Sequence, residues 1–168
     1  GGVGKTTLAT SVYMEICSQF QGHCIVENIR EESSKNGLEK LQETMLSLIF
    51  RREVTVHSVV EGKHKINSML CNRKVLIVLD DVHDFGQLKA LAGSHSWFGS
   101  GSRIIITSRD ERVLTRHVDK ICEVRLLSDD EALQLFKKHA YSVYKPVEDY
   151  EALSSRVVSY AAGLPLAL

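Results

Sequence analysis

The sequence predicts an α/β fold in which a three-layer arrangement with a parallel sheet is followed by the start of a helical subdomain. Short apolar runs alternate with helical patterns up to about Leu126, whereas only helical periodicity follows Ser128. The run Val75–Leu79 is continuously apolar, as expected for a strand buried on both faces. We therefore expect an α/β region over 1–126 and the beginning of a helical region over 127–168.

The first part of the chain predicts a helix, a strand and a second helix. Leu8, Val12 and Ile16 have helical spacing, and the apolar segment Cys24–Ile29 predicts a strand. The polar segment Ser33–Gly37 predicts a loop. A single helical stripe then contains Leu38, Leu41, Met45, Leu48 and Ile49.

The middle of the chain predicts one more helix and three strands. Ser58 and Glu61 have the spacing of a capping box, so we expect a helix that runs towards Cys71. Val75–Leu79 and Ile104–Ile106 predict buried strands, and Ile121–Arg125 predicts a shorter one.

The last part of the chain predicts two helices. Ser128 and Glu131 form a second capping-box pair, with Asp129 and Asp130 beside the positive helix start. Gly163 followed by Pro165 indicates a helix end. Between these signals, one stripe contains Tyr150, Leu153, Val157 and Ala161.

Composition narrows the class of protein. The 168 residues are 43% hydrophobic and 25% charged, with 21 basic and 21 acidic residues. This balance argues against direct nucleic-acid binding, and no apolar run is long enough to cross a membrane. Four widely spaced cysteines without a C-x-x-C motif predict free, mostly buried thiols in a reducing compartment, and hence a cytoplasmic protein.

The segment that carries most information is glycine-rich and lies at the start of the chain. Gly2-Val3-Gly4-Lys5-Thr6-Thr7 matches most of a phosphate-binding loop and leads directly into a helical pattern. Glycines allow successive backbone N–H groups to face an anion, and Lys5 would reach the β- and γ-phosphates. The Thr6 hydroxyl would bind Mg²⁺. The alternative is an ordinary glycine-rich turn, and we expect the strand that normally precedes such a loop to be missing.

Polar residues follow two of the predicted strands. Asp80 and Asp81 come directly after the run Val75–Leu79, at the end of a strand where open α/β sheets bind ligands. Asp80 could hold Mg²⁺, and Asp81 could orient or activate a water molecule. The alternative for this pair is a solvated turn.

Two further residues are candidates for nucleotide contacts. Arg109 follows the strand Ile104–Ile106, and a guanidinium there could bind a γ-phosphate and distinguish ATP from ADP. The alternative is a surface ion pair with Asp110. Gly163–Leu166 by itself favours a structural turn at a helix end, and the alternative is that Pro165 packs against an adenine ring.

These blocks, in this order, resemble the NB-ARC domain of plant disease-resistance proteins with leucine-rich repeats. The resemblance extends from the phosphate loop to Gly163–Leu168, through Leu76–Val82, Gly101–Arg109 and Leu126–Ala132. Val26–Glu31 resembles the subclass with an N-terminal TIR domain, although His83 stands where that subclass has Asp.

The resemblance implies a nucleotide switch in the cytoplasm or the nucleus. ADP would hold the protein inactive, and exchange for ATP would permit homo-oligomerisation that brings signalling domains together. Slow hydrolysis would reset it, so the intact protein would be a weak ATPase and the chain alone inactive. The family's TIR and leucine-rich-repeat domains would be intramolecular partners.

By this resemblance, each candidate residue has a role. Asp80 serves Mg²⁺ with Thr6, Asp81 serves hydrolysis, and Pro165 lies against adenine. Arg109 senses the γ-phosphate. The phosphates are held by Gly2, Val3, Gly4, Lys5, Thr6 and Thr7.

Two other functions remain open at this stage. A partitioning-type ATPase also uses Gly-Gly-Val-Gly-Lys-Thr-Thr, although the acidic pair, the Arg109 block and the Gly163–Leu166 end fit it poorly. A nucleotide-bound oligomerisation scaffold without turnover is the second alternative, against which the position of Asp81 argues mildly.

Overall fold

The computed structural model describes residues 2–115, 117–140 and 150–168, and it divides into two compact units. The first, Thr6–Ile121, is called the α/β unit below. The second, called the helical unit, combines Gly1–Lys5 with Cys122–Leu168.

A three-stranded parallel sheet forms the centre of the α/β unit. Its strands are β1 (Gly22–Val26), β2 (Val75–Val82) and β3 (Arg103–Ser108), in the spatial order β1-β2-β3. The central strand is β2, whose apolar run is buried as its sequence predicted. The register pairs Val26 with Leu79 and Leu79 with Ile106, so that all three strands end at the same edge.

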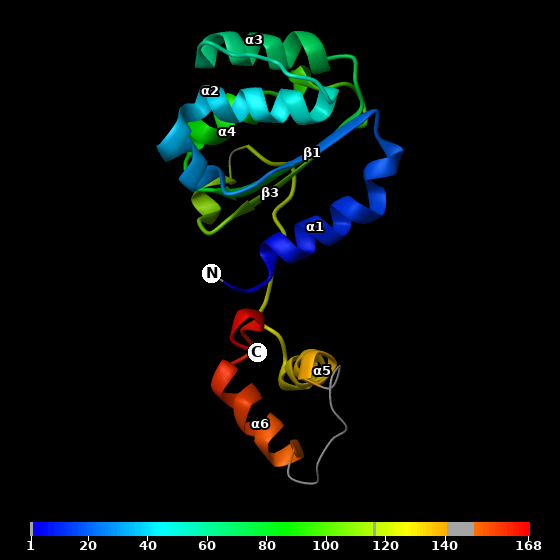
Figure 1. The fold of residues 1–168 in the computed structure, drawn as a ribbon, viewed down its shortest axis with the longest axis vertical. Coiled ribbons are helices and arrows are strands. Elements are labelled where there is room, and N and C mark those ends of the chain that lie inside the picture. Colours follow the sequence, from blue (N-terminus) through cyan, green and yellow to red (C-terminus); the bar gives the residue numbers. More distant parts are fainter. Residues whose placement is uncertain (1, 116, 141–149) are drawn as a thin grey trace. The chain divides into compact units, whose positions relative to one another are not determined.

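Helices lie on both faces of this sheet (Figure 1). One face carries α2 (Ile29–Phe50), α3 (Val59–Leu70) and α4 (Phe85–Ala92), while α1 (Lys5–Ile16) lies across the other. Short 3₁₀ turns occur at Cys17–Gln19, His95–Trp97 and Glu111–Val113. The predicted three-layer α/β fold is therefore confirmed.

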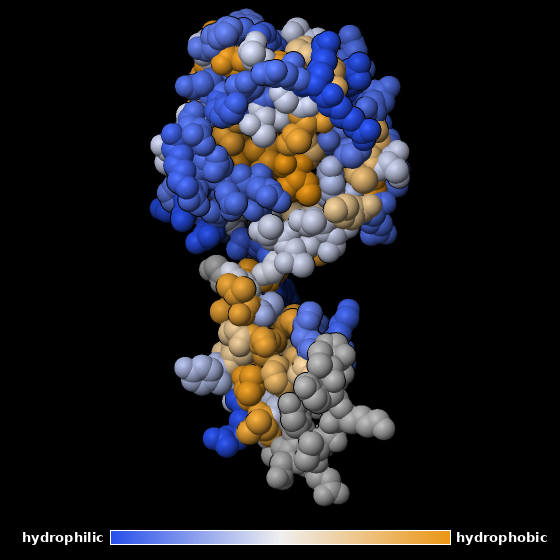
Figure 2. Space-filling view, in the orientation of Figure 1, coloured by the Kyte–Doolittle hydropathy of each residue, from blue (hydrophilic) through white to orange (hydrophobic). Residues whose placement is uncertain are grey.

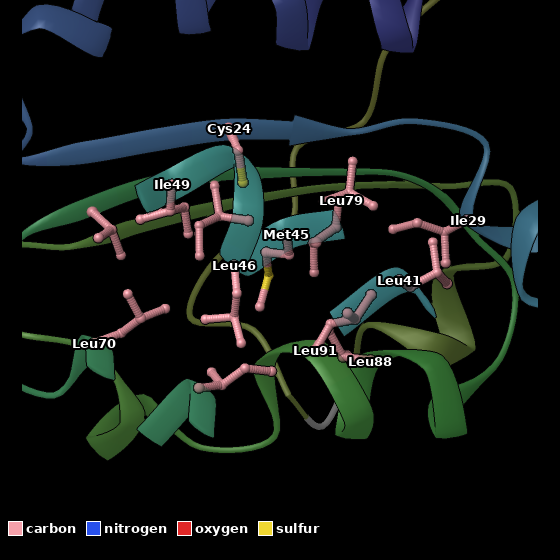
Figure 3. Close-up of a cluster of buried hydrophobic side chains, with 14 of the residues drawn as sticks. Cys24, Ile29, Leu41, Met45, Leu46, Ile49, Leu70, Leu79, Leu88 and Leu91 are labelled. Atoms are coloured by element: carbon pink, nitrogen blue, oxygen red, sulfur yellow. The ribbon is translucent and has the colours of Figure 1, made fainter. Parts of the chain in front are cut away.

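The hydrophobic core lies between the sheet and the layer of α2, α3 and α4 (Figure 3). Alternate β2 side chains enter it, as expected from the two-residue period of a strand. The labelled side chains that fill it are Cys24, Ile29, Leu41, Met45, Leu46, Ile49, Leu70, Leu79, Leu88 and Leu91. Burial at about 25 cal/mol per Å² of apolar surface makes this layer the main source of stability in the unit.

The second layer is held to the sheet by fewer contacts. Among the residues of α1, only Ala9 is buried, and Leu8 and Met14 are 49% and 67% exposed. The Tyr13 hydroxyl and His23 Nδ1 are 2.6 Å apart and join this helix to β1. The helix on this side of the sheet therefore buries fewer of its residues than the helices on the core side do.

Two predictions about α2 are wrong. The predicted loop Ser33–Gly37 is helical apart from Gly37, whose φ of 82° and ψ of 166° kink the helix. Polar residues can form the solvent-facing side of a helix whose other side is buried, so a polar composition does not by itself indicate a loop. Of the predicted stripe, Leu41, Met45 and Ile49 are buried but Leu48 is 47% exposed, and Leu46, which the stripe did not include, is fully buried.

Two strand predictions also need correction. The strand predicted over Cys24–Ile29 spans Gly22–Val26, because Asn28 turns the chain with a φ of 51° and Ile29 begins α2. No strand forms at Ile121–Arg125. Among the described residues, this segment pairs with none of the three strands of the sheet, and a strand needs a pairing partner.

The helical unit contains α5 (Asp129–Ala140), α6 (Tyr150–Ala161) and a 3₁₀ turn at Pro165–Ala167. The predicted capping box is present, with Glu131 N donating to Ser128 Oγ and Ser128 N donating to Glu131 Oε2. In the predicted α6 stripe, Ala161 is buried and Leu153 is exposed. The side chain of Tyr150 lies outside the described residues.

Among the described residues, no helix combines the length and the apolar character that crossing a bilayer requires. The four cysteines are free, as predicted, but only Cys24 is buried, and Cys122 is exposed. Burial raises the pKa of the Cys24 thiol to about 12.

A hollow of about 320 Å³ lies between β1 and α2. Its apolar lining includes Ile25, Val26 and Leu41, and its rim carries Glu32 and Lys40. Figure 2 shows apolar residues gathered on this face of the α/β unit, within a polar surround. Among the described residues β1 pairs with β2 alone, so this hollow lies beside the outer strand of the sheet.

A buried amide joins the three helices of the core layer. Gln42 on α2 is fully buried, and its Nε2 donates to Val59 O at 3.2 Å and to Ala90 O at 2.9 Å. Its Oε1 has no hydrogen-bond partner. A Cβ placed on Gly62 of α3 would lie only 1.9 Å from this oxygen. Gly62 is thus needed for space.

We expect Gly62→Ala to destabilise the contact between α2 and α3. The added methyl group must displace a buried amide that has no free volume, at a cost of about 1–3 kcal/mol. Hydrogen exchange in the intact protein should show that protection falls in peptides from both helices. The control is Val60→Ala on the same helix, where Val60 is 65% exposed. Equal protection in both variants would contradict the prediction.

Candidate functional site

Polar residues gather at the edge where the three parallel strands end. Asp80 follows Leu79 on β2, and Thr107 follows Ile106 on β3. Because Leu79 and Ile106 are register partners, Asp80 and Thr107 come side by side. Strand pairing thus brings together residues that are far apart in the chain.

Asp80 is a buried carboxylate held by two hydroxyl groups. The residue is 5% exposed. Its Oδ1 accepts hydrogen bonds from Thr6 Oγ1 at 2.7 Å and Thr107 Oγ1 at 2.6 Å. Thr6 lies in the first turn of α1. A buried carboxylate is costly unless it is hydrogen-bonded, so these hydroxyls stabilise its position.

Asp81 has a different environment from its neighbour. Its φ of 55° is uncommon for a residue other than glycine, although Asp tolerates it better than most. Its backbone N–H donates to Thr107 Oγ1 at 2.9 Å, so that one hydroxyl contacts both acidic residues. Arg109 Nε donates to Asp81 Oδ1 at 3.0 Å, and Arg30 Nε lies 3.7 Å from Asp81 Oδ2.

Arg109 forms a surface ion pair, as the alternative predicted, but its partner is Asp81 and not Asp110. Asp110 accepts hydrogen bonds from Arg112, whose Nη2 lies 2.7 Å from its Oδ2. The side chain and backbone N–H of Arg112 lower the pKa of Asp110 to about 2. Asp110 thus remains ionised and engaged with Arg112 over the whole physiological pH range, and Arg109 pairs with Asp81 instead.

The glycine-rich loop begins with backbone conformations that its sequence predicted. Gly2 and Gly4 have φ values of 85° and 90°, which glycine adopts at little cost. Val3 lies between them in a bend, and Lys5 is the first residue of α1, followed by Thr6 and Thr7. The positive end of a helix therefore starts at Lys5.

The turn that contains Pro165 packs within the helical unit. Leu166 N donates to Gly2 O at 3.3 Å, so this turn contacts the start of the glycine-rich loop. Gly163, at a φ of 74°, accepts a hydrogen bond from Leu127 N, and a Cβ on it would meet Leu127 O at 2.3 Å. The structural alternative for Gly163 therefore has direct support.

The donor set at the strand edge suits a hard cation. Magnesium prefers oxygen ligands and usually keeps several waters, with only one or two carboxylates from the protein. Thr6 and Asp80 supply a hydroxyl and a carboxylate that already lie in contact. Among the described residues, no three His, Cys, Asp or Glu side chains cluster in a way that could bind a metal ion. A cation here would need oxygen atoms from a ligand and water.

Sequence reasoning missed two residues of this site. Thr107 lies directly after the apolar run Ile104–Ile106, and its position at a strand end could have identified it. Arg30 has no comparable signal. It lies in the first turn of α2, and only the pairing of the strands brings that turn close to Asp81.

Comparison with known proteins gives a consistent result. Residues 1–145 match the model of the NB-ARC domain. Over its whole length the chain is 45% identical to TMV resistance protein N of Nicotiana glutinosa and 43% identical to disease resistance protein RUN1 of Vitis rotundifolia. It is 39% identical, over 99% of its length, to disease resistance-like protein DSC1 of Arabidopsis thaliana. It spans 15%, 13% and 14% of these relatives, respectively.

We expect Thr107→Val to loosen the edge where β2 and β3 end. Valine has nearly the shape of threonine but leaves Asp81 N without its acceptor and Asp80 with one hydroxyl fewer, a loss of about 1–3 kcal/mol. Hydrogen exchange in peptides that cover Leu79–His83 should therefore become faster.

The matched control is Thr107→Ser, which keeps the hydroxyl and loses only the methyl group. Its exchange should remain close to that of the wild type. Faster exchange in the serine variant, with unchanged exchange in the valine variant, would show that packing of the methyl group, and not the hydroxyl, holds this edge.

Proposed function

The chain belongs to the NB-ARC domain family, and on that basis we propose that it is the nucleotide-binding module of a plant immune receptor. In this proposal ADP holds the receptor inactive and ATP activates it. Slow hydrolysis of ATP returns it to the inactive state. The names of its relatives, a TMV resistance protein and disease resistance proteins, support the assignment to plant defence.

The contact between Thr6 and Asp80 carries the proposal. A hydroxyl and a carboxylate separated by 74 residues lie 2.7 Å apart, one from the start of a helix and one from the end of a central strand. These are the ligand types that hold Mg²⁺ in phosphate-loop proteins. When bound, the ion would neutralise phosphate charge, and Thr6 and Asp80 would hold it.

In this proposal, the other candidate residues bind the phosphates and the adenine ring of the nucleotide. Backbone N–H groups of Gly2–Thr7 and the amine of Lys5 bind phosphate oxygens, aided by the positive helix end. Pro165 packs against the adenine ring. Arg109 binds the γ-phosphate, which ADP lacks, and so gives the two nucleotides different contacts, without which neither could shift the conformational equilibrium.

The partners of the intact protein follow from the same proposal. A TIR domain and a leucine-rich-repeat domain would belong to the same polypeptide, and activation would proceed through a homo-oligomer. We place the protein in the cytoplasm or nucleus, with no direct contact with nucleic acid or membrane.

Of the two alternatives, the partitioning-type ATPase has lost its support, because the chain belongs to another family. A scaffold that binds nucleotide without turnover is favoured by one observation. Both oxygens of Asp81 already face arginine side chains, so a water molecule would have to share an oxygen that is engaged with a guanidinium group. Hydrolysis by the intact protein therefore separates the switch from the scaffold.

We expect Lys5→Arg to abolish binding of both ADP and ATP in the intact protein. The longer, planar guanidinium cannot replace a compact ammonium inside a tight phosphate loop. Isothermal titration calorimetry provides the measurement, with Lys89→Arg on the exposed side of α4 as the control. Undiminished affinity for both nucleotides in Lys5→Arg would refute the proposed site.

We expect Asp81→Asn to lower single-turnover ATP hydrolysis by about 100-fold, a typical contribution of a general base. Asn also tolerates the positive φ of this position, so the backbone should be preserved. ADP affinity, measured in parallel, should remain unchanged and serves as the control for folding. Equal hydrolysis rates in the variant and the wild type would favour the scaffold.

A further inference from the structure

Arg30 is held at the edge of the sheet that carries the candidate site. β1 ends at Val26, Asn28 reverses the chain direction with a φ of 51°, and α2 begins at Ile29, which is fully buried. Arg30 is the next residue. The buried Ile29 therefore anchors the first turn of α2, and Arg30 projects from an element whose start is fixed.

The two carboxylate oxygens of Asp81 face two different arginine side chains. Arg109 Nε donates to Oδ1 at 3.0 Å, and Arg30 Nε lies 3.7 Å from Oδ2. The two arginines come from opposite neighbours of β2, namely the helix after β1 and the end of β3. The acid thus bridges the three strand ends.

The other acids near Arg30 on α2 are engaged elsewhere. Glu31 Oε1 lies 2.6 Å from Lys35 Nζ, and Glu32 Oε2 accepts a hydrogen bond from Asn36 Nδ2 at 2.8 Å. Both contacts run along the outer side of the helix, in the i, i+4 relation. Asp81 is therefore the acid with which Arg30 pairs among the described residues.

We propose that Arg30 is a positioning residue that holds Asp81 while Arg109 turns towards the γ-phosphate of ATP. This inference rests on the proposed function. When Arg109 gives up its contact with Asp81, the carboxylate faces the added negative charge of the phosphate. Arg30 then supplies its remaining positive partner and reduces the cost of the exchange.

The proposal predicts which nucleotide binds more weakly when Arg30 is replaced. Without Arg30, Asp81 depends on Arg109 alone, so separation of that pair costs more. ADP has no γ-phosphate and leaves the contact between Arg109 and Asp81 intact, whereas ATP draws Arg109 away from Asp81. Loss of Arg30 therefore weakens ATP binding selectively. Because the side chains of Arg30 and Asp81 are 47% and 22% exposed, solvent limits the effect to a few-fold.

The test compares ATP and ADP affinities of the intact protein in Mg²⁺-containing buffer, by titration calorimetry. Arg30→Gln should weaken ATP relative to ADP by about threefold to fivefold, with ADP affinity unchanged. Arg30→Lys keeps the charge and should restore most of the preference. The control, Arg103→Gln, removes the same charge at the beginning of β3, at the opposite end of the sheet, and should have no effect.

A double-mutant cycle decides whether Arg30 acts through Asp81. In the Asp81→Asn background, adding Arg30→Gln should change the ATP preference no further. An effect of undiminished size there would overturn the proposal, because Arg30 would then contact phosphate itself. An unchanged preference in Arg30→Gln alone would overturn it as well. Absence of nucleotide binding by the wild type is a separate result, which would refute the proposed function.

Discussion

The register between the three parallel strands is the constraint on which the candidate site depends. Val26, Leu79 and Ile106 lie in one row across the sheet, and the polar residues that follow them meet at one edge. Side chains alternate with a period of two, so a slip of one residue between β2 and β3 would separate Asp80 from Thr107. Val75, Ile77 and Leu79 of β2 belong to the core layer, whereas Leu76 and Val78 are buried on the opposite face, so such a slip would exchange two differently packed sets of side chains.

The same edge gives two adjacent acids unlike surroundings. Asp80 is buried and contacts hydroxyl groups, whereas Asp81 is more exposed and contacts guanidinium groups. The left-handed conformation of Asp81 and its hydrogen bond to Thr107 separate the two environments. Thr107 links them, since its hydroxyl donates to the first acid and accepts from the backbone of the second. Two carboxylates placed this way can serve distinct purposes without competing for one cation.

One buried polar side chain, in addition to the apolar ones, determines how the helices of the core layer pack against each other. Gln42 occupies a position where helical periodicity would suit an apolar residue, and it donates to carbonyl groups near α3 and on α4. A buried amide accepts few arrangements, because its donors must be satisfied. It therefore fixes how the helices meet, which in turn supports the strand whose end carries Asp80.

The sequence by itself determined the α/β class, the buried central strand, the glycine-rich loop, and the choice of Thr6, Asp80 and Arg109 as candidates. These follow from local patterns: apolar runs, capping pairs and polar residues at strand ends. It did not identify Thr107 or Arg30, and it misjudged Leu48 and Ile121–Arg125. Those features depend on which segments pair across the sheet, and on which side of α2 faces the core. Only the tertiary structure decided them, because contacts between distant segments leave no periodic trace along the chain.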